Sequence, residues 1–302
     1  MRVLIGITTH NRAGMLPKAI ESALAQSYPL KHVAVFDDGS TDDTPALRAQ
    51  YPEVRWYRAE DPRGYLPARN QLMRETDADL YFSLDDDSWF MTGDEIEIGV
   101  GILREQPEVA AVAYDILEPA RPVSVEHGGM RLAHAVKGCG SLLRLSAARE
   151  AGFFIPSPGS YGGEENDLCV RLLDLGHEII FMPGVHVWHE RTILARDIPE
   201  QWRSGVCNDL VFALRRCPYP MVLWFVPAKI LNHLRYAVRR RLLRPYLKGI
   251  FLFLRSMLAL VATRDAVRSE TFREFSRRSR GFAPAPVTVV MPPVDWAVDT
   301  TP

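Results

Sequence analysis

Short apolar runs alternate with amphipathic segments through the first two-thirds of the chain. The runs predict buried strands at residues 3–8, 32–36, 54–57, 80–84 and 109–115. Helices are expected between them, at residues 16–26, 66–76 and 95–106, with another ending near Tyr51. Strands that alternate with helices at this spacing predict an α/β fold with a mainly parallel, doubly wound sheet.

Two later regions depart from this alternation. Residues 119–145 combine Pro and Gly with paired apolar runs, which predicts an inserted hairpin or loop over the sheet edge. Two further strands are expected at residues 179–182 and 185–188, just before His189. Beyond residue 199 the pattern favours helices.

Three carboxylates, Asp85, Asp86 and Asp87, follow the apolar run at residues 80–84 directly. Open α/β sheets place their ligands at the carboxyl ends of strands, where such crowded negative charge needs a positive partner. Oxygen ligands suit Mg²⁺ or Mn²⁺, often completed by a substrate diphosphate. The alternative is an acidic surface turn ahead of the helix that begins near Asp94.

Two other acidic motifs stand at expected element ends. Asp38 follows the second strand, where it either accepts hydrogen bonds from a nucleotide base or forms a turn and helix cap. Glu164, Glu165 and Asp167 open a helical pattern, and carboxylates there can also satisfy the helix's own N–H groups. The residues alone leave both pairs of alternatives open.

The order of the motifs resembles that of the inverting family 2 glycosyltransferases, which have the GT-A fold. The resemblance covers roughly residues 3–214 and rests on TTHNR, FDDGSTDDT, RGYLPARN, LDDD, GCGSLLR and GGEENDLCVRLLDLG. It is greatest to bacterial members that attach rhamnose-like or other sugars to polysaccharide or lipid-linked acceptors. The resemblance implies a sugar transfer from a nucleotide-diphosphate sugar to an acceptor hydroxyl, with Mn²⁺ or Mg²⁺ as cofactor.

The resemblance also implies roles for individual residues. Donor contacts are expected from Thr8, Asp38, Arg69, Asp85 and Asp86. The cation is expected on Asp87, with Asp86 as the alternative ligand, and His189 is expected to complete the metal or diphosphate site.

The acceptor side is implied in the same way. Glu165 is expected to be the general base, with Glu164 as the fallback because the family more often has Asp at the second position. Acceptor contacts are expected from Gly138, Trp89 and Asp167.

The net charge of −1 conceals an uneven distribution of charged residues along the chain. Residues 203–280 contain 17 Lys and Arg but 4 Asp and Glu. Amphipathic helices on an anionic membrane surface fit this composition; packing on the catalytic domain or at a homodimer interface is the alternative. The apolar run at 249–262 is interrupted by Arg255 and is expected to be too short to cross a bilayer.

We therefore expect a catalytic domain at 1–214, a basic helical region at 215–283 and an extended tail at 284–302. Four cysteines without zinc-like spacing and an N-terminus without a signal-peptide pattern predict a cytoplasmic protein, with peripheral contact to the inner membrane face. The alternatives are a nucleotidyltransferase, whose Gly-rich phosphate loop is poorly matched, and a non-catalytic membrane-surface protein. Nucleic-acid binding is not expected, because no such module is identifiable.

Overall fold

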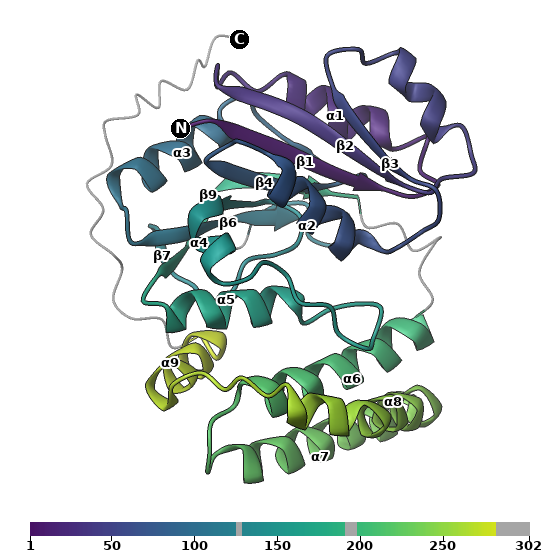
Figure 1. Ribbon diagram of the computed structural model, residues 1–302, viewed down its shortest axis with the longest axis vertical. Coiled ribbons are helices and arrows are strands. Elements are labelled where there is room, and N and C mark those ends of the chain that lie inside the picture. The colour runs from purple at the N-terminus through teal and green to yellow at the C-terminus, as the bar shows by residue number, and fades with distance from the viewer. Residues whose placement is uncertain (125–128, 191–197, 282–302) are drawn as a thin grey trace.

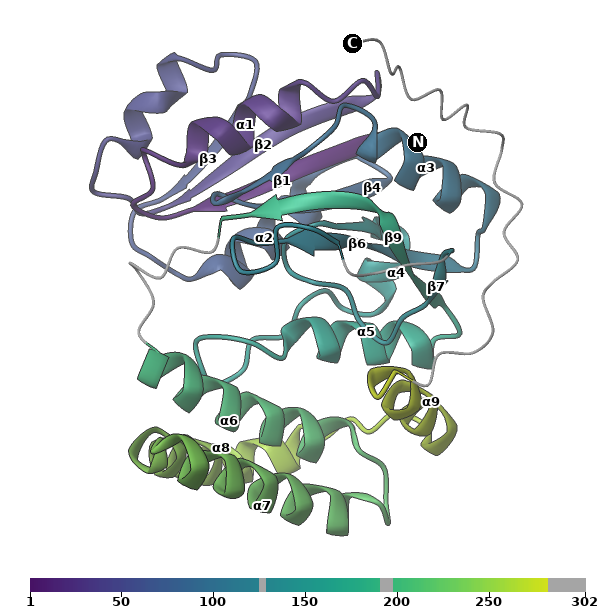
Figure 2. The same ribbon diagram turned by 180° about the vertical axis from the view of Figure 1, so that it is seen from behind.

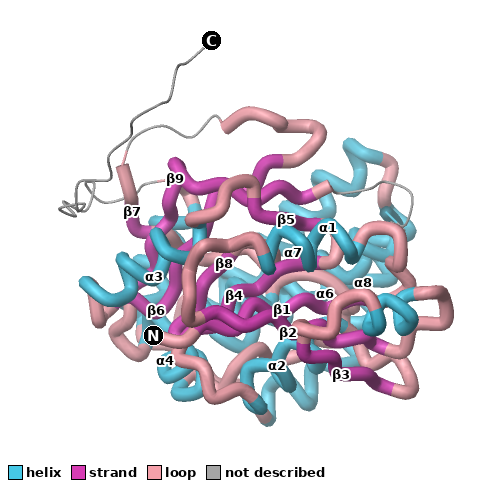
Figure 3. The backbone as a smooth tube through the Cα atoms, turned by 90° about the horizontal axis from the view of Figure 1, so that it is seen from above, coloured by secondary structure: helices cyan, strands magenta, loops and turns pink. Residues whose placement is uncertain are grey.

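A mixed β-sheet forms the centre of the protein, whose computed structural model describes residues 1–124, 129–190 and 198–281. The strand order is β3-β2-β1-β4-β8-β6-β9-β5, and β7 pairs with β9 (Figure 3). The strands are β1 (Val3–Thr9), β2 (Lys31–Asp38), β3 (Arg55–Ala59), β4 (Leu80–Asp85), β5 (Ser88–Phe90), β6 (Val109–Leu117), β7 (Arg131–Leu132), β8 (Ser141–Arg144) and β9 (Glu178–His189).

Strands β3, β2, β1 and β4 are parallel, as the sequence predicts. Strand β1 is buried along its whole length, with Val3, Ile5 and Ile7 in one core and Leu4 in the other. A strand covered on both faces needs such a continuous apolar run. The α/β fold class predicted from the sequence is confirmed.

The middle of the sheet corrects the prediction for residues 119–145. Strand β8 does not cover the sheet edge but lies inside the sheet, antiparallel to both β4 and β6. The two strands expected at 179–182 and 185–188 are one strand, β9, which shifts its register against β6 between Tyr114 and Asp115. The helix expected to end near Tyr51 is a short 3₁₀ helix, η1 (Thr44–Ala49).

Helices cover both faces of the sheet (Figure 1). On one face lie α1 (Leu16–Leu24) and α3 (Glu95–Glu105), and on the other lie α2 (Tyr65–Glu75), α4 (Leu145–Glu150) and α5 (Glu164–Asp174). This is the layered arrangement expected when crossover helices connect parallel strands.

A further helical layer lies beyond α5 (Figures 1 and 2). It contains α6 (Ile198–Arg216), α7 (Val222–Arg240) and α8 (Leu243–Ala262), while α9 (Ser269–Ser279) packs against α5. Helix α6 contributes to both sides, since Phe212 joins the core beneath the sheet whereas Val206 and Leu210 pack with α7 and α8. The expected boundary after residue 214 thus falls inside a helix, and the tail expected at 284–302 lies outside the described residues.

A buried ion-pair network connects α5 to α6. The Asp167 carboxylate accepts hydrogen bonds from Arg216 Nε at 2.7 Å and from Arg171 Nε at 3.0 Å. All three side chains are less than one-tenth exposed. These contacts connect α5 to α6 through Asp167, whose expected place on the acceptor side stays a prediction.

Replacing Asp167 by Ala should destabilise the protein strongly, because the buried guanidinium group of Arg171 would lose its carboxylate and that of Arg216 would keep only its pair with Asp265. Breaking a buried pair costs about 3–5 kcal/mol. Chemical denaturation measures the change in the free energy of unfolding. Asp77→Ala is the matched control: its pair with Arg2 is exposed and should contribute at most about 1 kcal/mol. If Asp167→Ala were as stable as the wild type but inactive, the acceptor function would be favoured instead.

Candidate active site

The carboxyl ends of β1, β2 and β4 meet at one edge of the sheet. The register pairs Thr8 with Phe36 of β2 on one side and with Asp85 of β4 on the other. This brings the motifs that the sequence analysis identified separately to a single edge, where α/β sheets bind their ligands.

Asp38 anchors the loop that leads into α2. Its Oδ1 accepts a hydrogen bond from the backbone N–H of Arg63 at 2.8 Å, and its Oδ2 accepts one from Gly64 at 2.7 Å. Gly39 is required beside it, because its φ is +71° and a Cβ there would lie 2.9 Å from the backbone N of Pro62. The carboxylate expected to contact the donor base therefore also fixes the start of α2.

Helix α2 carries Arg69 into the site. The guanidinium group is 3% exposed, pairs with Asp85 and lies 5.0 Å from the Tyr65 ring. Burial alone would lower the pKa of Arg69, but the neighbouring groups, Asp85 first among them, together outweigh burial and raise the pKa, so the guanidinium group stays charged. Arg69 thus holds Asp85 in place. Its expected contact with the donor diphosphate would be a second role.

The acidic triplet has the donor groups of a cation site. Asp87 Oδ1 lies 3.2 Å from His189 Nε2, and ligand atoms of Asp85, Cys139 and His189 all lie within 4.8 Å of one another. Burial raises the pKa of Cys139 well above its ordinary value, so its thiol is not a natural ligand for a hard cation. Of that group the Asp85 carboxylate and the His189 imidazole remain, and Asp87 adds a second carboxylate through its contact with His189. Carboxylate and imidazole ligands suit Mn²⁺.

Asp86 is the least compensated member of the triplet. Burial, together with the neighbouring charge of Asp87, raises its pKa to about 7. Both causes disfavour the charged form of Asp86, and a nearby positive charge would favour it. A divalent cation at this position fits the residues.

Helix α5 presents the two glutamates opposite this cluster. Its start follows two glycines with positive φ, Gly162 at +82° and Gly163 at +96°. Glu164 is buried and accepts a hydrogen bond from the Tyr65 hydroxyl, whereas Glu165 is partly exposed. Glu164 is therefore occupied by a structural contact and Glu165 is the more accessible carboxylate.

Gly138 leaves the space in which Glu165 and Arg69 approach each other. A Cβ at Gly138 would lie 2.7 Å from Glu165 Oε1 and 3.0 Å from an Nη atom of Arg69. Burial raises the pKa of Glu165 to about 7, with Glu164 adding to the rise and Arg69 opposing it. A carboxylate with such a pKa can both accept and release a proton near neutral pH.

Trp89 lies at the margin of the cluster, on the short strand β5. Its ring stacks on Trp188 at 6.1 Å between centroids, and Lys18 Nζ lies 3.5 Å from the ring centroid. The Lys18 ammonium group thus covers one face of the Trp89 ring, which is expected to contact the acceptor.

The loop before α5 is fixed by residues that the sequence analysis did not single out. Asn208 of α6 donates hydrogen bonds to the carbonyls of Gly159, Tyr161 and Gly162, and its Oδ1 accepts one from Gly159 N at 2.8 Å. Ser204, also on α6, accepts one from Ser160 N at 3.0 Å. The partners in each contact lie more than 40 residues apart in the sequence. No local sequence pattern could therefore have identified them.

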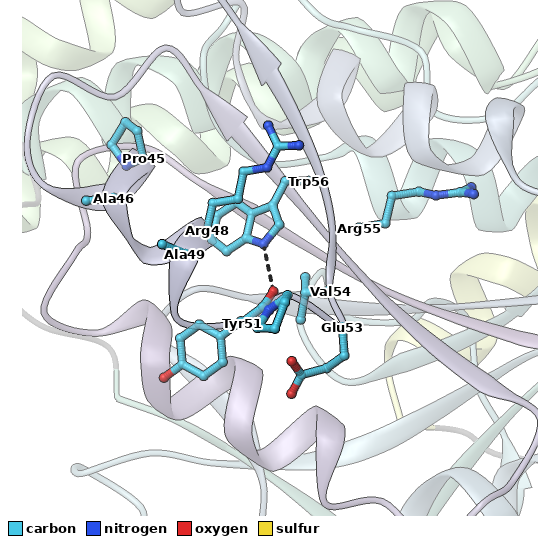
Figure 4. Close-up of a pocket in the computed structure, with 10 residues that line it drawn as sticks. Pro45, Ala46, Arg48, Ala49, Tyr51, Glu53, Val54, Arg55 and Trp56 are labelled. Atoms are coloured by element: carbon cyan, nitrogen blue, oxygen red, sulfur yellow. Dashed lines mark hydrogen bonds between the residues drawn. The ribbon is translucent and has the colours of Figure 1, made fainter.

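A cavity of about 870 Å³ lies elsewhere, between η1 and the first residues of β3 (Figure 4). It is lined by Tyr51, Val54 and Trp56, whose Nε1 donates to the Tyr51 carbonyl. Trp56 pairs in register with Val35, several residues before the strand end at which Asp38 lies. The carboxylate cluster, not this cavity, carries the candidate chemistry.

Comparison with known protein families matches the N-terminal part of the chain. Residues 4–127 match the family profile described as Glycosyl transferase family 2. This part of the chain, less than half of its 302 residues, is similar to the family 2 glycosyltransferases. No curated protein sequence matches the chain at a significant level.

Two solved structures share the fold of the chain at low sequence identity. TarS of S. aureus (residues 1–349) in complex with UDP-GlcNAc has a TM-score of 0.65 and 13% identity, over 93% of this chain and 92% of that one. The mannosyltransferase PcManGT from Pyrobaculum calidifontis, in complex with GDP-Man and Mn²⁺, has a TM-score of 0.59 and 16% identity, over 92% of this chain and 87% of that one. These likenesses confirm the GT-A fold.

If the cluster binds a cation, Mn²⁺ should raise the melting temperature of the metal-free protein. A ligand at one hundred times its Kd stabilises the folded state by about 2.7 kcal/mol. Asp87→Asn and His189→Ala should lose most of this gain, because each removes a candidate ligand. Thermal denaturation with and without Mn²⁺ measures it.

The control for this experiment is Asp94→Asn, an exposed residue at the start of α3. It should keep the full Mn²⁺ effect. An equal gain in all four proteins would assign the cation to another place.

Proposed function

We propose that the protein is a metal-dependent, inverting glycosyltransferase that moves a sugar from a nucleotide-diphosphate donor to a hydroxyl of a glycan, a lipid-linked molecule or another acceptor. The observation that carries this proposal is that Glu165 lies across Gly138 and Arg69 from the cluster of Asp85, Asp87 and His189. The side with Asp85, Asp87 and His189 is suited to binding a diphosphate through a cation. The side with Glu165 is suited to deprotonating the acceptor.

The donor side would work mainly through positioning and charge. Asp38 fixes the loop before α2, and Arg69 fixes Asp85. A divalent cation held by Asp87 and His189 would neutralise charge on the departing diphosphate. PcManGT and TarS were solved with GDP-Man and UDP-GlcNAc respectively, which supports a nucleotide-sugar donor here.

On the acceptor side, inversion requires a single displacement. The acceptor oxygen forms a bond to the anomeric carbon while the bond from that carbon to the diphosphate oxygen breaks, and the electron pair leaves with the diphosphate. Glu165 takes the proton of the attacking hydroxyl. Glu164, held by Tyr65, would keep the start of α5 in place. The geometry favours Glu165 over Glu164 because Glu165 is the more exposed of the two.

The test begins with a screen of nucleotide sugars for hydrolysis or thermal stabilisation in the presence of Mn²⁺. With the donor found, Glu165→Gln should lower kcat by about 10²–10⁴, because the amide keeps the shape but cannot accept a proton. Donor affinity should barely change. Steady-state kinetics and donor titration separate the two effects.

The pH dependence gives a second readout of the same residue. Since the pKa of Glu165 is raised to about 7, kcat of the wild type should fall as the pH decreases below that value and the base becomes protonated. Glu164→Gln, the matched control, should retain the larger share of activity. An inactive Glu164→Gln beside a nearly active Glu165→Gln would move the base to Glu164.

A further inference from the structure

Helices α7 and α8 have large apolar side chains that are exposed to solvent instead of packing in the core. Along α8, five large apolar side chains recur at helical spacing and are each more than half exposed: Leu247, Phe251, Leu254, Leu258 and Val261. The opposite part of the same helix packs through Tyr246, Phe253 and Leu260 against α6 and α7. Helix α8 therefore has two apolar stripes, of which only one is covered.

Helix α7 also has exposed large apolar side chains. Trp224 is 65% exposed and Val238 57%, whereas Ala237 faces the inner cluster that α6, α7 and α8 share. Both helices lie on the far side of α6 from the sheet (Figures 1 and 2). We define the docking face as these exposed apolar residues of α7 and α8.

Basic residues accompany the docking face, and acidic residues are absent from its sequence. Residues 210–264 contain no Asp or Glu. Seven exposed basic side chains lie on the two helices or at the turn between them: Arg235, Arg239, Arg240, Arg241, Arg244, Lys248 and Arg255. An apolar stripe with basic residues around it is the pattern of a helix that lies in an anionic membrane interface.

We propose that the docking face binds the surface of an anionic lipid membrane. Its charge favours this occupant over a second copy of the chain, because two such faces would bring the uncompensated arginines together. The apolar stripe would enter the boundary between headgroups and acyl chains, while the basic side chains contact lipid phosphates.

The apolar run at 249–262 is expected to be too short to cross a bilayer, but helix α8 also includes residues 243–248 and by length and composition could cross one. Its packing favours a surface position instead. A Cβ at Gly249 would lie 2.7 Å from the carbonyl oxygen of Arg203 and 2.9 Å from Val206 Cβ, so α8 lies directly on α6. Insertion across a bilayer would expose this part of α6.

The position of α6 connects the docking face with the candidate base. Asn208 and Ser204 of α6 hold the loop before Glu165, while Arg203 and Val206 contact α8. If the proposed function holds, a membrane on the docking face would favour lipid-linked acceptors, which are presented at that surface. Membrane binding itself does not depend on the proposed function.

Sedimentation of the full chain with vesicles tests the proposal. Vesicles of phosphatidylcholine with one part in four phosphatidylglycerol should bind the protein, whereas pure phosphatidylcholine should bind it much more weakly. Phe251→Ser with Leu258→Ser should reduce binding by at least about tenfold, because two exposed apolar anchors are lost. Arg240→Gln and Arg244→Gln should each reduce it roughly fivefold.

Leu30→Ser and Arg48→Gln are the matched controls, because both residues are exposed on the opposite part of the protein, near the sheet. They should bind vesicles as the wild type does. Equal binding by the docking-face variants, or no binding to anionic vesicles, would overturn the proposal.

Two further outcomes would also overturn it. Protein that stays with the vesicles after carbonate extraction would indicate that α8 crosses the bilayer. A dimer in light scattering that Leu258→Ser dissociates, without vesicle binding by the wild type, would assign the docking face to a second copy. Because these measurements need no donor or acceptor, their failure is distinct from a failure of the glycosyltransferase proposal.

Discussion

The ion pair between Arg69 and Asp85 is the interaction on which the candidate site depends. Three consecutive carboxylates at the end of β4 repel one another, and burial together with this repulsion raises the pKa of Asp86 to about 7. Arg69 is the buried positive charge that offsets part of this repulsion. The same guanidinium group approaches Glu165 over Gly138, so it connects the donor side of the site with the candidate base.

The elements around this pair explain why it can form. Asp38 holds the loop before α2 by two backbone N–H groups, and α2 then places Arg69 beneath the end of β4. From the other direction, Asn208 holds the loop that ends at Gly163, which sets the start of α5 and the position of Glu165. Both sides of the site therefore depend on hydrogen bonds between segments distant in sequence.

Local patterns predicted most of the N-terminal half. Apolar runs and intervening amphipathic helices are local properties, so β1 to β4 and their crossovers could be predicted before the structure was known. Strand β8 could not, because Ser141–Arg144 looks like any short apolar run and its place between β4 and β6 is decided by long-range pairing. Two strands are expected in place of β9 because Pro and Gly interrupt its apolar pattern. In the structure the strand continues through these residues with a shift in its register against β6.

The difference between local patterns and long-range contacts also decides which side-chain functions could be predicted. The carboxylates of the triplet and of α5 could be proposed from their motifs, since carboxylates at a strand or helix end have a limited number of uses. The ion pairs of Asp167 could not be predicted, because its partner Arg216 lies 49 residues further along the chain. The exposure of Phe251 and Leu258 was likewise invisible in a pattern that fits a core helix equally well.

The central claim is that the carboxylate cluster holds a nucleoside diphosphate through a divalent cation. Isothermal titration of the wild-type protein with UDP, GDP and dTDP, in Mn²⁺ and again in EDTA, tests it most directly. We expect at least one nucleotide to bind in Mn²⁺ and its affinity to fall sharply in EDTA, since carboxylates alone repel a diphosphate. Equal affinity in both buffers, or no binding of any of the three in Mn²⁺, would contradict the account.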